Sequence, residues 1–307
     1  MKTVAVLMST YNGEKYLREQ IDSILNQSNV DVRLFVRDDG SSDNTKEILT
    51  EYAEKYDVIN LDFAENAGVG NSFMNLLYSA PDTFDYYAFA DQDDIWESKK
   101  LFEATELLQK SGKFLYASNQ ENVDKNGNSL GLRYDENCKI HMTPVSILEK
   151  NMIAGCTMVV TNDFYRILIE ESRRPSEELL NNRIHDVWLA MVASVYDGIV
   201  YDKRSFIKYR QHENNVVGAG KSSLSKRIKE RTKKLSNKKL RNGRSKLAQE
   251  ICLKFPEQVE KYPFLKVCAN AKKLRNKRKL IKAHKELRSY TGESYLGFVC
   301  KVTLGLF

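Results

Sequence analysis

The sequence lacks the cysteine patterns of disulfide-rich and zinc-binding proteins. Its 307 residues include five cysteines, an odd number, and no two of them form a Cys-x-x-Cys pair. Because paired or closely spaced cysteines mark a disulfide framework or a zinc site, the sequence encodes neither. A reducing cytoplasm is therefore the expected compartment.

Long hydrophobic runs are missing as well. The first apolar run, residues 4–8, is too short for the hydrophobic region of a secretory signal and ends at polar residues. The longest later runs, residues 152–160 and 187–196, fall well below the roughly 20 residues that a helix needs to cross a bilayer. We therefore expect neither a signal peptide nor a transmembrane helix.

Three common ligand-binding motifs are absent from the chain. There is no Walker P-loop, and Phe73 stands where the dinucleotide-binding fingerprint would place its third glycine after Gly68 and Gly70. An EF-hand starting at Asp91 would need glycine at position 96, where the chain has Trp96. These absences make a P-loop or an EF-hand untenable and a Rossmann NAD site a poor explanation of the chain.

What the sequence does contain is an uneven distribution of charge. Hydrophobic residues make up 42% and charged residues 29%, close to the averages for globular proteins. Residues 1–220 hold 23 Lys and Arg against 35 Asp and Glu, a balance of −12, whereas residues 221–307 hold 25 against 6, a balance of +19. We therefore expect an acidic domain over residues 1–220 and a basic region over residues 221–307 that meets a polyanion.

Over the first 120 residues, short apolar runs alternate with segments of helical period. Leu17, Ile21 and Ile24 recur at helical spacing, as do Leu101 and Leu108. The alternation predicts an α/β fold with a mostly parallel central sheet flanked by helices, in which ligands bind beyond the carboxyl ends of the strands. The expected strands are residues 3–8, 33–37, 58–63, 86–90 and 113–117, with a later strand at 154–160 and a short helix from Asp163.

Four polar clusters follow predicted strands at the position where such sheets bind ligands. The cluster DDGSSD, residues 38–43, taken by itself could equally be a turn before a helix or a functional site, because Asp, Gly and Ser favour turns and helix caps. The clusters are STYNG at residues 9–13, DDGSSD at 38–43, NAGVGN at 66–71 and DQDD at 91–94.

The fourth cluster places three carboxylates, Asp91, Asp93 and Asp94, within four residues. Like charges this close raise one another's pKa unless positive charge lies between them. A divalent cation such as Mg²⁺ supplies that charge and completes its shell with water and phosphate oxygens. We favour a cation site over the alternative, a solvated acidic turn that caps the helix from Ser98.

Two further clusters lie beyond residue 180. Asp186 precedes an apolar helical pattern, where its simplest role is that of an N-cap, and a carboxylate at a helix start can also face a pocket. Residues 209–215, YRQHENN, are rich in side chains that bind anions, metals or hydroxyls. A single histidine in such a segment is more often structural than a ligand.

Taken in order, these segments resemble the family 2 glycosyltransferases, which are inverting enzymes of the GT-A fold that use nucleotide sugars. The resemblance covers residues 1–220. Within the family, these segments are most similar to those of bacterial rhamnosyltransferases of surface-polysaccharide synthesis. The matching segments are VLMSTYNGEKY (6–16), RDDGSSDNT (37–45), NAGVGN (66–71), DQDDIW (91–96), GCTM (155–158), His185-Asp186 and YRQHENNVVG (209–218).

The resemblance implies roles for individual residues. Asp186 would be the catalytic base that takes the proton of the acceptor hydroxyl, although many members carry an acidic residue where this chain has His185. Asp93 would bind Mg²⁺ or Mn²⁺ against the donor diphosphate, and His212 would approach the metal or the diphosphate. The residues expected around the nucleotide sugar are Thr10, Tyr11, Glu14, Asp39, Asn66, Gly68, Asn71, Asp91 and Gln92.

The expected partners are a nucleotide-sugar donor such as dTDP-rhamnose and a lipid-linked glycan acceptor. Each Lys or Arg near anionic lipid contributes about 1 kcal/mol, so residues 221–307 are expected to dock the enzyme on the inner face of the cell membrane. One alternative for this region is a mainly helical extension that packs on the body or on a second subunit. Nucleic-acid binding and a nucleotidyltransferase that releases pyrophosphate are the rival functions, but no DNA- or RNA-binding module is recognisable.

Overall fold

The computed structural model describes residues 1–181, 185–211 and 243–307. The chain divides into two compact units, and each is made of segments that are separate in the sequence. The predicted boundary after residue 220 lies outside the described residues and stays a prediction. The first unit takes residues 1–139, 153–171 and 198–219, and the second takes residues 140–152, 172–197 and 220–307.

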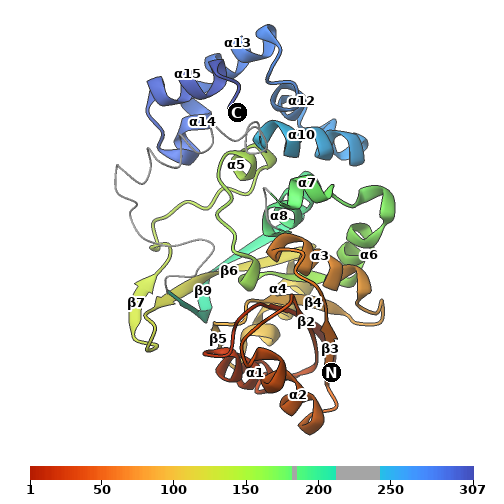
Figure 1. The fold of residues 1–307 in the computed structure, drawn as a ribbon. Helices are drawn as coiled ribbons and strands as arrows, with labels where there is room; N and C mark the ends of the chain where they lie inside the picture. Colours follow the sequence, from red (N-terminus) through yellow and green to blue (C-terminus); the bar gives the residue numbers. More distant parts are fainter. Residues whose placement is uncertain (182–184, 212–242) are drawn as a thin grey trace. The chain divides into compact units, whose positions relative to one another are not determined.

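A mixed sheet forms the centre of the first unit (Figure 1). In one half, β1 (Lys2–Thr10), β2 (Val30–Asp38), β3 (Ile59–Phe63) and β4 (Tyr86–Ala90) are parallel, in the order β3-β2-β1-β4. The order continues with β8, β6, β9 and β5, and this half mixes parallel and antiparallel pairs. Its strands are β5 (Ile95–Trp96), β6 (Leu115–Val123), β7 (Ser129–Leu132), which pairs with β6, β8 (Val159–Thr161) and β9 (Ile199–Arg210).

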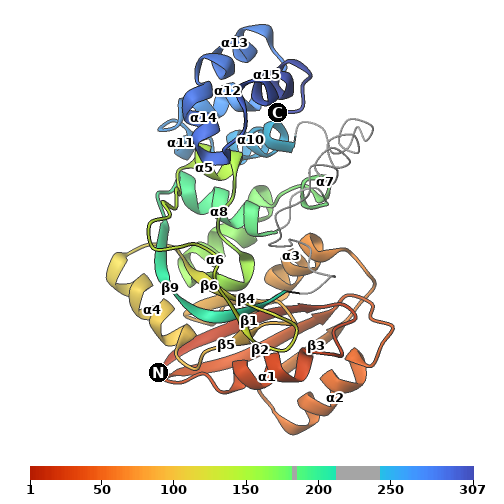
Figure 2. The same cartoon turned by 90° about the vertical axis from the view of Figure 1, so that its left-hand side faces the viewer.

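Helices cover both faces of this sheet (Figure 2). Helices α1 (Leu17–Leu25), α2 (Thr45–Lys55) and α4 (Lys100–Ser111) share a core with Val4 and Val6 of β1. On the opposite face, Phe73 of α3 (Val69–Ser79) packs on Phe89, and Tyr165 of α6 (Asn162–Ile169) stacks on Tyr87 with ring centroids 3.8 Å apart. Successive strand residues point to opposite faces, so strands buried on both sides are continuous apolar runs. The predicted α/β class is confirmed.

The predicted strands differ from the observed ones mainly at their ends. β4 covers the predicted residues 86–90, whereas β1, β2 and β6 extend beyond their predicted limits. The strand predicted from residue 154 is wrong in its first part, because Gly155–Thr157 form the 3-10 turn η1. Thr157 donates its N–H and its hydroxyl to the carbonyl of Ala154, at 3.1 and 2.8 Å, and this local bonding replaces strand pairing.

The described residues of the second unit form helices and connecting loops but no strand, which confirms the predicted helical character of the basic region. Helix α8 (His185–Val195) is buried along its whole length. Among the described residues, no helix combines the length and the apolarity that crossing a bilayer requires. The other helices are α5 (Pro144–Glu149), α7 (Glu177–Leu180), α10 (Gly243–Lys254), α11 (Pro256–Val259), α12 (Pro263–Ala269), α13 (Leu274–Lys282), α14 (His284–Thr291) and α15 (Tyr295–Thr303).

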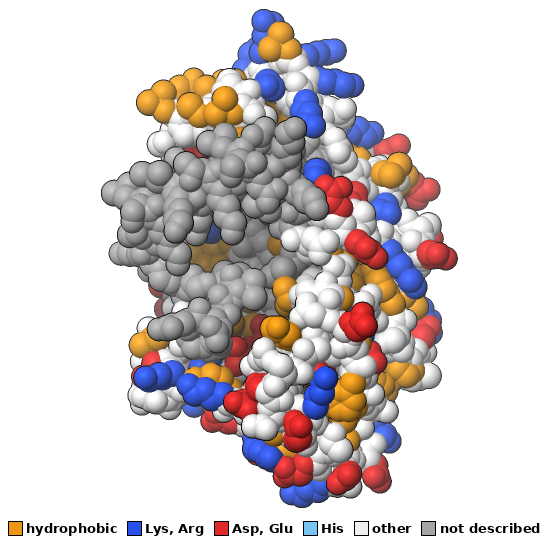
Figure 3. Space-filling model, in the orientation of Figure 1, with side chains coloured by type: hydrophobic (Ala, Val, Ile, Leu, Met, Phe, Trp, Pro, Cys, Tyr) orange, Lys and Arg blue, Asp and Glu red, His pale blue; other side chains and the backbone are white. Residues whose placement is uncertain are grey.

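A buried carboxylate joins α5 to the C-terminal helices. Glu149 is 4% exposed, and its Oε2 lies 3.3 Å from Arg244 Nε and 3.4 Å from Lys301 Nζ. Arg244 also donates to the main-chain oxygen of Glu149 at 2.7 Å. These two cations are neutralised inside the unit, whereas Lys and Arg side chains over α13 face outward (Figure 3).

Candidate active site

The loops that follow β1 to β4 meet at one edge of the sheet, because these strands run parallel. Their main chains are hydrogen-bonded to one another where the strands end. Asp39 N–H donates to the carbonyl of Thr10 at 2.8 Å, and Ala64 N–H donates to the carbonyl of Asp38 at 3.0 Å. The structure therefore brings together the four polar clusters of the first 100 residues.

Gln92 links the loop after β4 to the loop after β1. Its Oε1 accepts the N–H of Tyr11 at 2.8 Å, and its Nε2 donates to the carbonyl of Tyr11 at 3.0 Å. Gly13 provides the space for this amide, since a Cβ at position 13 would lie 2.3 Å from Gln92 Oε1. Gln92, expected beside the nucleotide sugar, thus also holds two loops together.

Asp38 is the anchor of the loop after β2. It is fully buried, and its carboxylate accepts the N–H of Ser41 at 2.9 Å, the hydroxyl of Ser41 at 2.5 Å and the hydroxyl of Thr10 at 3.0 Å. Thr10, expected to line the nucleotide site, is itself 1% exposed. Its side chain therefore supports the floor of the site.

Asp39 connects the loop after β2 to the loop before α3. Its two oxygens accept the N–H groups of Ala67 at 2.9 Å and Gly68 at 3.0 Å, and Arg37 Nη2 lies 3.6 Å from it. Gly40 has a φ of 84°, and a Cβ there would lie 3.3 Å from the main-chain nitrogen of Asn66. The tight passage between these loops therefore favours glycine.

The other predicted donor-binding residues of these loops lie along the same edge. Tyr11, Glu14 and Asn66 are exposed. Glu14 Oε2 accepts the N–H of Asn44 at 3.0 Å and its side-chain amide at 2.8 Å. Asn71 is partly buried and donates to the carbonyl of Ala67 at 3.0 Å.

Asp94 is fully buried, so the alternative of a solvated acidic turn is wrong for this residue. Its Oδ1 accepts the N–H of Arg210 at 3.3 Å, and its Oδ2 has no hydrogen-bond partner among the described residues. Burial, followed by the charges of Asp93 and Asp91, raises the pKa of Asp94 well above its usual value. Additional positive charge at this loop would stabilise the ionised carboxylates.

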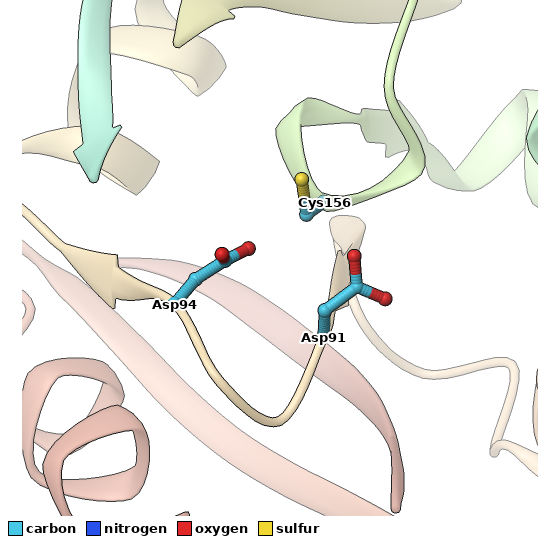
Figure 4. A group of neighbouring side chains, drawn as sticks. All are labelled: Asp91, Asp94 and Cys156. Atoms are coloured by element: carbon cyan, nitrogen blue, oxygen red, sulfur yellow. The ribbon is translucent and has the colours of Figure 1, made fainter. Parts of the chain in front are cut away.

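Asp91, Asp94 and Cys156 could hold a cation between the loop after β4 and the η1 turn (Figure 4). One ligand atom from each lies within 4.8 Å of the others. Burial raises the pKa of the Cys156 thiol well above its ordinary value, and the charges of Asp94 and Asp91 raise it further. A protonated thiol is a poor ligand, so the carboxylate oxygens are the groups that fit Mg²⁺ or Mn²⁺. Asp93, the predicted ligand, is partly buried in the same loop.

Lys100 is a buried lysine that the motif analysis missed. It is fully buried, its Nζ lies 3.5 Å from the centre of the Trp96 ring, and it forms no hydrogen bond among the described residues. Burial lowers the pKa of Lys100 to about 7, although Cys156 and Asp94 act in the opposite direction. The lysine therefore provides only part of a positive charge near neutral pH.

Arg210, at the end of β9, holds the acidic loop in place. Its guanidinium is 3% exposed and donates to the carbonyls of Asp93 at 3.1 Å and Lys125 at 3.2 Å. It also donates to the carboxylate of Glu19 at 2.5 Å and lies over the ring of Tyr16. The sequence placed Arg210 in the YRQHENN cluster but gave no sign of this role.

Asp186, the predicted base, belongs to the second unit. It lies in the first turn of α8, whose described range begins at His185, so the N-cap prediction is wrong. Its Oδ1 accepts the N–H of Val187 at 2.6 Å, its Oδ2 accepts the side-chain amide of Asn151 at 3.4 Å, and it is 9% exposed. Burial lowers the pKa of His185 to about 3, which keeps that ring neutral. His212 lies outside the described residues.

Comparisons with known proteins point to one family. Residues 5–166 match the family described as Glycosyl transferase family 2. The chain is 31% identical over 227 residues to dTDP-rhamnosyl transferase RfbG of Shigella flexneri, covering 71% of this chain and 76% of that protein. It is 29% identical over 164 residues to an uncharacterized glycosyltransferase of Nostoc sp., covering 53% of this chain and 50% of the relative.

A solved structure shares the fold. Residues 1–349 of S. aureus TarS, crystallised in complex with UDP-GlcNAc, superpose with a TM-score of 0.56 at 16% sequence identity. The match covers 99% of this chain and 90% of that chain.

We expect Arg210→Lys to destabilise the protein, because an ammonium group cannot reach the Asp93 and Lys125 carbonyls and the Glu19 carboxylate together. Leaving a buried carbonyl unpaired costs about 1–3 kcal/mol, which should appear as a lower free energy of unfolding in urea. Arg204→Lys is the matched control on the same strand, since Arg204 is 59% exposed and exposed ion pairs contribute little. Equal effects of the two substitutions would contradict the anchoring role of Arg210.

Proposed function

The chain belongs to glycosyl transferase family 2, and from this premise we propose that it transfers L-rhamnose from dTDP-rhamnose to a hydroxyl of a growing surface glycan. Transfer of a sugar from a nucleotide sugar follows from the family. The choice of rhamnose is supported by the relative named dTDP-rhamnosyl transferase. The observation that carries the proposal is that four polar loops, one of them the acidic loop with its buried Asp94, meet at one edge of the sheet.

We propose that the nucleotide lies along this edge. Tyr11, Glu14 and Asn66 are exposed there and offer an aromatic ring, a carboxylate and an amide. The carboxylate of Asp39 accepts the N–H groups of Ala67 and Gly68. It has further lone pairs, which would accept a pyrimidine N–H. Thr10, Gly68, Asn71 and Gln92 would shape the pocket, and Asp91 would meet the ribose.

The acidic loop would serve the departing diphosphate. Asp93, with Asp91 and Asp94 beside it, would hold Mg²⁺ or Mn²⁺, and His212 would lie near the diphosphate. When bound, such a cation neutralises the negative charge that develops on the leaving oxygens. Arg210 donates its guanidinium to the main-chain carbonyl of Asp93 and its backbone N–H to the carboxylate of Asp94, so the loop would be positioned before the donor arrives.

Asp186 is proposed as the base. It would accept the proton of the acceptor hydroxyl as that oxygen forms a bond to the anomeric carbon and the bond to the diphosphate breaks. Attack opposite the leaving group inverts the anomeric configuration without a covalent enzyme intermediate. The hydrogen bonds from Val187 and Asn151 would orient the carboxylate.

We propose a lipid-linked acceptor at the cytoplasmic face of the cell membrane. The proposal is supported by the balance of +19 over residues 221–307, since anionic lipid attracts basic segments. The basic region would then keep the enzyme near an acceptor that cannot leave the bilayer.

The donor can be identified by thermal shift with dTDP-rhamnose, UDP-sugars and GDP-sugars, each with and without Mg²⁺ or Mn²⁺. A ligand that binds only the folded chain raises its apparent stability by mass action, so dTDP-rhamnose with metal should give the largest shift. A larger shift with another sugar nucleotide would replace dTDP-rhamnose as the donor. Release of pyrophosphate in place of nucleoside diphosphate would indicate a nucleotidyltransferase.

Asp186→Asn should lower the rate of transfer by about 10²- to 10⁴-fold, because the amide cannot accept the hydroxyl proton. Donor affinity, measured by calorimetry, should be unchanged. Asp163→Asn is a matched control, since Asp163 is also in the first turn of a helix but is exposed. Full turnover by the Asp186 variant would remove this residue as the base.

Asp93→Ala should weaken donor binding by more than about tenfold and make it insensitive to chelator. Wild-type donor affinity should fall when chelator is added, because the diphosphate loses its counter-charge. Calorimetric titration of the donor with and without Mg²⁺ measures both effects, and Asp57→Ala, at an exposed site, is the control. A wild-type affinity indifferent to chelator would refute the metal-binding role of Asp93.

A further inference from the structure

Helix α13 presents a cationic face to solvent. At 100° per residue, its exposed positions all fall on one side of the helix. Leu280, on the opposite side, is fully buried within the second unit. The exposed residues are Leu274, Arg275, Arg278, Lys279 and Lys282, which we call the α13 face.

The four cations of the α13 face have no acidic counterpart. Among the described residues none of them forms a salt bridge, and Glu286 is the one acidic residue in the sequence from 270 to 292. Like charges four residues apart on a helix repel, as Arg275 with Lys279 and Arg278 with Lys282 must. Unlike Arg244 and Lys301, which Glu149 neutralises, these cations are exposed and could meet an external anion.

Exposed leucines accompany this charge. Helix α15 packs against α13, and Leu296 at its start is 74% exposed. Leu304, just after α15, is 62% exposed, and Leu274 on α13 is 68% exposed. Figure 3 shows hydrophobic side chains gathered over α15 and Lys and Arg side chains over α13.

The combination of exposed cations and exposed leucines favours one kind of anionic partner over others. A nucleic acid or a free polyphosphate attracts cations but gains nothing from exposed leucines, whereas a bilayer interface takes up both kinds of side chain. In residues 295–307 the exposed large apolar side chains are Tyr295, Leu296 and Leu304, whereas Phe298, Val302 and Phe307 are buried in the unit. A membrane is therefore the partner whose chemistry fits the whole surface.

We propose that the α13 face, together with Leu296 and Leu304, is a docking surface for anionic phospholipid. The α13 cations meet the headgroup phosphates, and the leucines enter the boundary of the acyl region. The contact depends only on the chemistry of this surface. Its purpose, to bring the catalytic unit to a lipid-linked acceptor, rests on the proposed function.

The test is co-sedimentation of the full chain with vesicles of phosphatidylglycerol and phosphatidylcholine, without donor or acceptor. Changing Arg275, Arg278, Lys279 and Lys282 to Glu should weaken binding by about tenfold or more, since each basic residue at the surface contributes to attraction. The control changes Lys55, Lys99, Lys110 and Lys139, all exposed in the first unit, to Glu, and so alters net charge equally. Equal losses in the two variants, or wild-type binding to pure phosphatidylcholine at the same strength, would overturn the proposal.

A second variant separates a membrane from other polyanions. Leu274→Ser with Leu296→Ser should weaken vesicle binding but leave the salt-dependent retention on heparin unchanged. Leu296→Trp should show a blue-shifted fluorescence emission when anionic vesicles are added. Vesicle binding unaffected by the serine substitutions would reject the entry of the leucines into the membrane. A gel shift with RNA that depends on the α13 face and exceeds vesicle binding would reject the membrane as the partner.

Donor binding by the same variants keeps this test independent of the proposed function. Each variant should retain the wild-type thermal shift with nucleotide sugar and its circular dichroism spectrum. Vesicle binding that persists when no nucleotide sugar binds would leave the docking surface intact and reject the proposed function. Donor binding without vesicle binding would reject the docking surface and leave the proposed function intact.

Discussion

The first unit depends on burying carboxylates at one edge of its sheet. Asp38, Asp39 and Asp94 are almost inaccessible, and a buried carboxylate is unfavourable unless hydrogen-bond donors surround it. The chain provides these donors largely from the main chain of neighbouring loops, such as Ala67 and Gly68 for Asp39. Satisfying the acids and joining the loops are therefore the same set of interactions. Loss of one carboxylate would loosen two loops at once.

Within the part of the chain that the structure describes, hydrogen-bond donors reach both oxygens of Asp38 and Asp39, but not both oxygens of Asp94 in the acidic loop. One oxygen of Asp94 lacks a hydrogen-bond partner among the described residues, and Lys100 nearby is itself weakened as a cation by burial. Arg210 neutralises Glu19 and binds the carbonyl of Asp93, so it fixes the loop without pairing with the cluster's own unpaired oxygen. Burial and the neighbouring acids raise the pKa of Asp94, so a cation bound at this loop would favour its ionised form.

Much of the fold could be predicted because apolar runs and turn residues are local signals. Residues 86–90 become a strand because all five are apolar or aromatic and four of them, Tyr87 to Ala90, are buried between two helical layers. The polar clusters could be found because each directly follows such a run. Lys100 and Arg210 could not be assigned, because their roles depend on contacts with residues far away in sequence, such as Arg210 with Glu19. The helical pattern after Asp186 was recognised, but the start of the helix was placed too late, because a carboxylate at this point suits both the N-cap and the first turn.

The pairing of Gln92 with Tyr11 has a consequence for how the donor edge is built. The Gln92 side chain is chemically a peptide group, and it meets Tyr11 as a neighbouring strand would, giving one hydrogen bond and taking one. The main chain of Tyr11 is thereby tied to the loop after β4 beyond the last β1–β4 pair, Met8 with Ala90, through a side chain in place of backbone. The two loops are therefore cross-linked where the sheet has already ended, so their course does not have to follow the pleat of a strand.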